Sequence, residues 1–152
     1  MKEIKFRAWD NVENEMYYTG EEELILFMFD SCGIVADKVI PDESEKGFYV
    51  EKLEHLQYMQ FTGLKDKNDK EIFEGDIESD ENGNLSVVCY LKKYGAYCFV
   101  PLVLYVHEDY ENQVEYGYDC YFHNAIPSKY STVVGNIYEN PELLEESKNG
   151  TK

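Results

Sequence analysis

The sequence contains few cationic side chains, and this shortage limits what the chain can bind. Lys and Arg together number 14 among 152 residues, against 31 Asp and Glu, which gives a formal net charge of −17. Binding to DNA or RNA requires Lys and Arg side chains that replace the counterions around the phosphates. We therefore expect no direct contact with nucleic acid and no adsorption to an anionic membrane.

Long apolar runs are also lacking. The longest, Leu24–Phe29, is far too short to span a bilayer. The first residues lead directly into mixed polar sequence, with no apolar signal region. Hydrophobic residues nevertheless make up 43% of the chain, which is enough to build a core. These features predict a folded, cytoplasmic protein.

Cysteine is scarce, and no two cysteines form a CxxC pair. The four are Cys32, Cys89, Cys98 and Cys120. Their spacing excludes a zinc knuckle and a thioredoxin-type redox pair. In a reducing cytosol we expect them to be buried hydrophobes or free thiols. A hairpin could bring Cys89 and Cys98 face to face, although their proximity in the sequence does not establish this.

The hydrophobic pattern consists of many short strand-like segments between turn formers. It predicts strands within the ranges 3–9, 16–18, 22–29, 34–40, 48–50, 58–62, 72–77, 85–91, 96–106 and 133–138. A short helix is an alternative for 22–29, and Pro101 indicates an edge or a break within 96–106. Many short strands at close spacing favour a small barrel or roll, so we predict a mainly β (α+β) fold.

Turn residues mark the joints of this pattern. The charged segment 41–47 is the best candidate for a loop, and Asn82-Gly83 is a strong signal for a hairpin. Leu53 and Leu56 are three residues apart, which allows one helical turn between two strands.

A helix is expected near the end of the sequence. Asn140 can cap it, Pro141 suits its first position, and Glu142 complements its dipole. We predict a helix over about 141–147 and fraying from Ser147 to Lys152.

Three segments of the chain resemble the YopX family of phage and prophage proteins. They are Met1–Asp10, the stretch from Met59 to Ile77 (MQFTGLKDKN, then EIFEGDI), and Val134–Leu144 (VGNIYENPELL), with Gly95-Ala96-Tyr97 in between. The resemblance implies an N-terminal β-rich region (1–56), an SH3-like barrel or roll (57–140), and a C-terminal helix with a frayed tail (141–152). It also implies a phage or prophage origin and a tendency to self-associate. It supplies no catalytic, cofactor-binding or metal-binding residue.

The sequence departs from the family pattern after Gly75-Asp76-Ile77, where the strand is usually apolar. Here four carboxylates alternate: Glu74, Asp76, Glu78 and Asp80. On a strand they would lie on one face, about 7 Å apart. This pattern favours the solvent face of an edge strand, where charges discourage edge-to-edge pairing. The alternative is a site for a hard cation such as Ca²⁺ or Mg²⁺.

The sequence carries no recognised catalytic motif. Its three histidines, His55, His107 and His123, form neither HxxxH nor HExxH. A metal-dependent hydrolase that combines the carboxylates with His107 or His123, and with Cys120 or Ser128 as nucleophile, is one hypothesis, because such sites are assembled in space. Structural or surface roles are the simpler interpretation.

One stretch is rich in both tyrosine and acidic residues, a composition typical of contact surfaces. The candidate interaction surface comprises Tyr105, Glu108, Asp109, Tyr110, Glu111, Glu115, Tyr116, Tyr118, Asp119 and Tyr121. The alternative is an exposed β loop with a few core-facing tyrosines. We predict a non-catalytic module that forms a homo-oligomer or binds a basic host or phage protein. A second hypothesis is an acidic mimic of DNA that inhibits a host nucleic-acid-binding protein.

Overall fold

The computed structural model describes residues 3–114 and 127–150. The chain divides into two compact units, Ile4–Gln60 and the part from Phe61 onward, which also includes the first three residues. The division falls within strand β6 (Gln57–Lys65). The first half of this strand pairs with β1 (Phe6–Asp10), and its second half pairs with β7 (Glu71–Phe73). The boundary expected from the sequence was residue 56.

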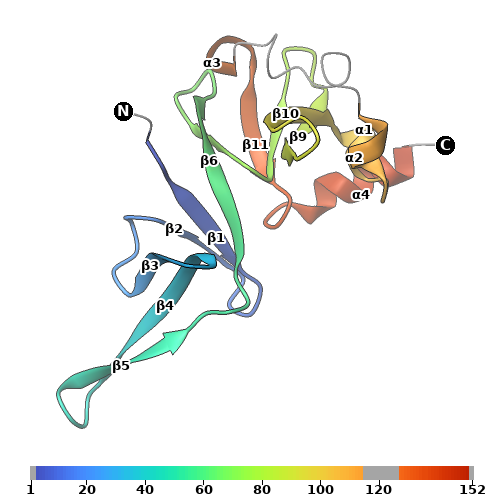
Figure 1. Ribbon diagram of the computed structural model, residues 1–152. Helices are drawn as coiled ribbons and strands as arrows, with labels where there is room; N and C mark the ends of the chain where they lie inside the picture. The colour runs from blue at the N-terminus through green and yellow to red at the C-terminus, as the bar shows by residue number, and fades with distance from the viewer. Residues whose placement is uncertain (1–2, 115–126, 151–152) are drawn as a thin grey trace. The chain divides into compact units, whose positions relative to one another are not determined.

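The first unit contributes strands to two small antiparallel sheets (Figure 1). In one sheet, β1 pairs with the strand that follows it and with β6. The other sheet consists of the next three strands, and the second of these pairs with both of its neighbours. The strands after β1 are β2 (Glu15–Tyr18), β3 (Ile25–Asp30), β4 (Gly33–Asp42) and β5 (Gly47–Lys52). The strand interpretation of 22–29 is confirmed, and segment 41–47 contains the turn between β4 and β5.

The core of the first unit lies on one face of the β3–β4–β5 sheet. Ile25 and Ala36 are buried there, and partly buried Phe27 and Tyr58 pack around them with ring centroids 6.5 Å apart. The predicted helical turn at Leu53 and Leu56 is wrong, because both residues lie in an irregular segment. Both are nevertheless buried, so their spacing serves the core of this unit.

The second unit is a curled, half-barrel-like sheet with short helices (Figure 1). Its strand order is β10-β9-β8-β11, with every pairing antiparallel. After β7 come β8 (Asp76–Ser79), β9 (Leu85–Leu91), β10 (Ala96–Pro101), α1 (Leu102–Tyr105), α2 (Tyr110–Gln113), α3 (Pro127–Tyr130), β11 (Thr132–Asn136) and α4 (Pro141–Gly150). The predicted mainly β class is confirmed, including the short C-terminal helix.

Buried aliphatic residues of the central strands form the core of the second unit. Ile77 and Val87 are fully buried, and Leu143 and Leu144 of α4 pack against the same cluster. The predicted hairpin at Asn82-Gly83 is confirmed, with Gly83 at a φ of 82° between β8 and β9. Glycine adopts such a positive φ at little cost.

The break expected at Pro101 is confirmed, but the strand does not resume as far as residue 106, and the fraying expected from residue 147 is wrong. The strand expected over 96–106 ends at Pro101, and α1 begins at the next residue. Proline lacks an N–H and so ends the ladder, while its fixed φ suits the position before a helix. The helix expected to fray from residue 147 continues to Gly150. In the described ranges no helix has both the length and the apolar character that crossing a membrane requires.

Cys89 and Cys98 lie directly opposite each other on β9 and β10, as the sequence had suggested they could. Both side chains are buried. Burial raises the pKa of the Cys89 thiol to about 12. The third described cysteine, Cys32, is exposed.

These environments predict selective thiol chemistry. We expect iodoacetamide at pH 8 to modify Cys32 in the native protein and to leave Cys89 and Cys98 unmodified until denaturant is added, because only an accessible thiolate reacts. Peptide mass spectrometry before and after addition of urea measures this. Modification of Cys89 as fast as that of Cys32 in the native state would contradict the burial of the pair.

Candidate functional site

The structure describes five of the ten residues predicted as an interaction surface. Tyr105 and Tyr110 are half-buried, pack against the core of the second unit, and have ring centroids 4.9 Å apart. Burial raises the pKa of both phenols, that of Tyr105 to about 12. Glu108, Asp109 and Glu111 are exposed. The other five, Glu115, Tyr116, Tyr118, Asp119 and Tyr121, lie outside the described residues.

The alternating carboxylates do not form the solvent face of an edge strand, so that interpretation is wrong. Strand β8 lies between β9 and β11, and Asp76 and Glu78 are buried with exposures of 1% and 4%. Asp80 belongs to the turn after β8. Within residues 3–114 and 127–150, no three His, Cys, Asp or Glu side chains lie together in a way that could hold a metal ion.

Several buried polar residues of the family-like segments hold turns together. Asp76 accepts a hydrogen bond from the N–H of Phe73 at 2.8 Å. Asp66 accepts three: Oδ1 from the N–H groups of Asn68 and Lys70, and Oδ2 from that of Val133 on β11. These carboxylates satisfy backbone N–H groups of their own turns and, through Val133, of β11, which gives them a structural role.

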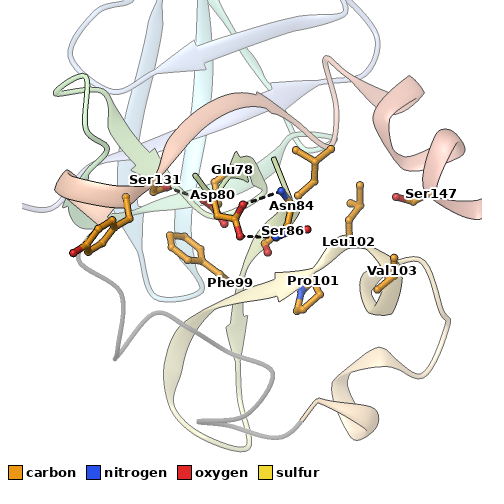
Figure 2. A pocket seen from close by; sticks show the side chains of 12 residues that line it. Glu78, Asp80, Asn84, Ser86, Phe99, Pro101, Leu102, Val103, Ser131 and Ser147 are labelled. Atoms are coloured by element: carbon orange, nitrogen blue, oxygen red, sulfur yellow. Dashed lines mark hydrogen bonds between the residues drawn. The ribbon is translucent and has the colours of Figure 1, made fainter. Parts of the chain in front are cut away.

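Glu78 differs from these residues because hydroxyl groups, and no backbone N–H, hold its carboxyl group. The Ser131 hydroxyl donates to Glu78 Oε2 at 2.9 Å, and Ser86 on the neighbouring strand also hydrogen-bonds to it. Figure 2 shows Glu78 and Ser131 facing each other. Burial raises the pKa of Glu78 to about 7; the nearby Asp80 charge adds to this, and the two serines oppose it.

A pocket of about 540 Å³ opens beside this carboxyl group. Its polar end carries two carboxyl groups, from Glu78 and Asp80. The remaining lining residues are Asn84, Leu85, Ser86, Phe99, Pro101, Leu102, Val103, Tyr130, Ser131 and Ser147 (Figure 2). Asp80 is held by its own turn, since its carboxylate accepts from the Asn84 backbone and side-chain amides at 2.9 and 2.8 Å. The arrangement is a hollow with apolar walls and one acidic end.

A second feature is an exposed apolar sheet face in the first unit. Residues directly opposite in an antiparallel pair share a face, and alternate residues along a strand do as well. The pairings Met28 with Val35 and Val39 with Val50 therefore place these residues on one side of the sheet, away from Ile25 and Ala36. We call this side the outer face; its apolar members are Leu26, Met28, Val35, Val39, Phe48 and Val50.

Neither of the two described histidines lines the Glu78 pocket. His55 Nε2 lies 2.7 Å from Asp10 Oδ1, in the first unit. Burial alone would raise the pKa of Asp10, but hydrogen bonds from the N–H groups of Glu13 and Val12, and from His55, bring it below its usual value. This carboxylate therefore anchors the turn after β1. His107 is exposed and does not line the pocket, and His123 lies outside the described residues.

Comparison with known proteins settles the family. A family model described as YopX protein matches residues 5–145. The chain belongs to the YopX family. Among solved structures, it is similar to the crystal structure of protein EF1440 from Enterococcus faecalis, with 25% sequence identity and a TM-score of 0.57 over 95% of this chain and 99% of that one. No curated protein matches the chain.

The Glu78 site was missed by reasoning from the sequence. Ser131 is 53 residues away from Glu78 in the chain, so no local motif joins them. The one available signal was the departure noted above: an acidic residue at a strand position that the family usually fills with an apolar side chain.

Proposed function

We propose that this YopX-family protein is a non-catalytic interaction module that binds a second copy of itself through the outer face of the β3–β5 sheet. The observation that carries the proposal is the exposure of large apolar side chains on that face. Leu26, Met28, Phe48 and Val50 are 47%, 42%, 68% and 49% exposed. Contiguous exposed apolar residues are uncommon on soluble monomers and mark interaction sites.

The charge distribution favours a second copy over a basic partner. Residues 4–60 contain 13 acidic and 5 basic residues, a net charge of −8. On the strands of the outer face, however, the charged side chains are only Asp30, Asp37 and Lys52, and Asp37 lies opposite Lys52. This face therefore adds little repulsion between two copies and offers few carboxylates to a cationic partner.

The size of the outer face predicts a weak association. Three strands span roughly 15 Å, and the apolar part of the face extends about 25 Å along them. A standard interface buries about 800 Å² on each partner, so this face is roughly half the standard size. Two such faces can pack as a β-sandwich about 10 Å thick. We expect a concentration-dependent dimer.

Sedimentation velocity over a wide concentration range tests the proposal. Val50→Asp, which places a charge on the outer face, should weaken dimerisation at least about tenfold. Tyr49→Asp is the matched control, since Tyr49 is exposed on the opposite side of the same strand, and this variant should dimerise as the parent does. Higher salt should strengthen the dimer by screening the like net charges.

The results of these measurements distinguish self-association through the outer face from the alternatives. A monomer at every concentration and salt level contradicts self-association, and equal weakening by both substitutions contradicts the outer face. Loss of the dimer at high salt would indicate contacts between opposite charges instead.

The alternative functions have less support in the geometry. A mimic of DNA needs a row of exposed carboxylates at regular spacing, but in the alternating row from Glu74 to Asp80 the structure buries Asp76 and Glu78. A hydrolase built from Glu78 and His107 would need the two groups in one site, and His107 is not in the pocket lining.

A further inference from the structure

The Glu78 pocket contains a buried acidic group that the proposed self-association does not use. The Glu78 side chain lines the hollow from β8, while Ser86 on β9 and Ser131 before β11 approach the same carboxyl group. An ionised carboxylate offers about four lone-pair positions, and two hydroxyl donors leave room for further hydrogen bonds. Burying such a group is costly, so its position beside a cavity calls for an explanation.

We propose that this pocket binds a small organic cation with an apolar body, whose N–H donors bond to Glu78. The volume of about 540 Å³ lies within the range of ligand pockets, which combine apolar walls with a few orienting polar groups. Phe99, Pro101 and Leu102 supply apolar wall, and the two carboxyl groups supply the polar end. An ammonium or amidinium group is the natural partner of that end.

The charged neighbours of the pocket are consistent with this ligand class. The other titratable groups in its lining are Asp80 after β8 and Tyr130 at the end of α3. The nearby cation of Lys129 lies over the ring of Tyr130, 4.8 Å from its centre, and Lys129 does not line the pocket. An anionic ligand would therefore meet two carboxyl groups and no lining Lys or Arg, whereas a cation would compensate their charge.

Binding of a cation should be coupled to release of a proton. Burial sets the pKa of Glu78 near neutrality, so a large part of the population carries a proton at pH 6.5. A bound cation favours the ionised carboxylate, and the displaced proton passes to the buffer. This coupling distinguishes binding at Glu78 from loose attraction to the acidic surface, where carboxylates are already ionised.

Isothermal titration calorimetry with benzamidine as the probe tests the proposal, with its neutral analogue benzamide as the comparison. At pH 6.5 benzamidine should bind at least about tenfold more tightly than benzamide, since the amidinium makes charge-assisted hydrogen bonds. Titrations in phosphate and in ACES buffer, which differ in ionisation enthalpy and contain no organic cation with an apolar body, should reveal net proton release.

Two variants locate the binding. Glu78→Gln should weaken benzamidine binding at least about tenfold and abolish proton release, because an amide is neutral and does not titrate. Glu81→Gln, at an exposed carboxylate of the adjacent turn, should leave both unchanged. Absence of benzamidine binding at millimolar concentration, equal affinity for benzamide, or unchanged binding by Glu78→Gln would each overturn the proposal. None of these results depends on dimerisation.

Discussion

Replacement of Glu78 by Gln is expected to stabilise the protein at pH 8.5 and to have a much smaller effect at pH 4.5. The folded-state pKa of about 7 lies above the ordinary value of 4.5. As pH rises from 4.5 to 7, the unfolded chain ionises this group while the folded chain retains the proton, so the free energy of unfolding falls. Above pH 7, the difference between the folded-state and unfolded-state pKa of Glu78 lowers the free energy of unfolding by at most about 3 kcal/mol.

Glutamine keeps the shape and a carbonyl acceptor for Ser131 but has no charge to bury. Urea denaturation followed by far-UV circular dichroism at the two pH values measures the difference in the free energy of unfolding. Glu81→Gln is the matched control, because Glu81 is exposed on the following turn. An equal effect of Glu78→Gln at both pH values would show that Glu78 is ionised throughout, and would remove the basis for coupled proton release.

The Asp66→Ala substitution should destabilise the second unit by about 2–4 kcal/mol. The carboxylate accepts backbone hydrogen bonds at 2.8, 3.0 and 2.9 Å from Asn68, Lys70 and Val133. In the variant, water can accept hydrogen bonds from the N–H groups of Asn68 and Lys70, because both residues are exposed. It cannot reach the N–H of Val133, which is buried on β11. A buried donor that loses its partner costs about 1–3 kcal/mol, and the loop loses its anchor as well.

Asp69→Asn provides the comparison within the same loop. Asp69 is exposed, has a φ of 65° and forms a surface ion pair with Lys65 at 3.4 Å, a type of contact that contributes about 0–1 kcal/mol. Asparagine removes the charge and tolerates the positive φ, which alanine does not. We therefore expect Asp66→Ala to unfold at a clearly lower urea concentration than Asp69→Asn. If the two variants unfold at the same urea concentration, the hydrogen bond to β11 contributes nothing to stability.

The parts of the fold that could be predicted from the sequence are those set by local chemistry. Asn82-Gly83 specifies a hairpin because glycine tolerates a positive φ. The short apolar runs in 25–30 and 85–91 have the length of strands and are bounded by turn residues, which favours strands. The helix after Pro101 was missed because Leu102 to Tyr105 are apolar and suit a strand equally well by composition. Short apolar runs do not distinguish the two.

The candidate site depended on long-range pairing, which local patterns do not contain. The sequence pattern of a solvent-exposed strand face is also that of four alternating acidic residues here: Glu74, Asp76, Glu78 and Asp80. Only the pairing of β8 with both β9 and β11 places Asp76 and Glu78 inside. The exposure of the outer face could not be predicted either. Met28 and Val50 belong to apolar strands, and the sequence of such a strand alone indicates burial in a core.

The position of β11 beside β8 also has a consequence for synthesis of the chain. During translation, residues 76–79 emerge well before residues 132–136, their partners on that side. Until the later segment arrives, nascent β8 has an open edge, Glu78 lacks the Ser131 hydroxyl, and Asp66 lacks the Val133 amide. The hairpins of the first unit join neighbouring segments and can close early. The ribosome therefore releases a chain whose second unit completes its sheet last.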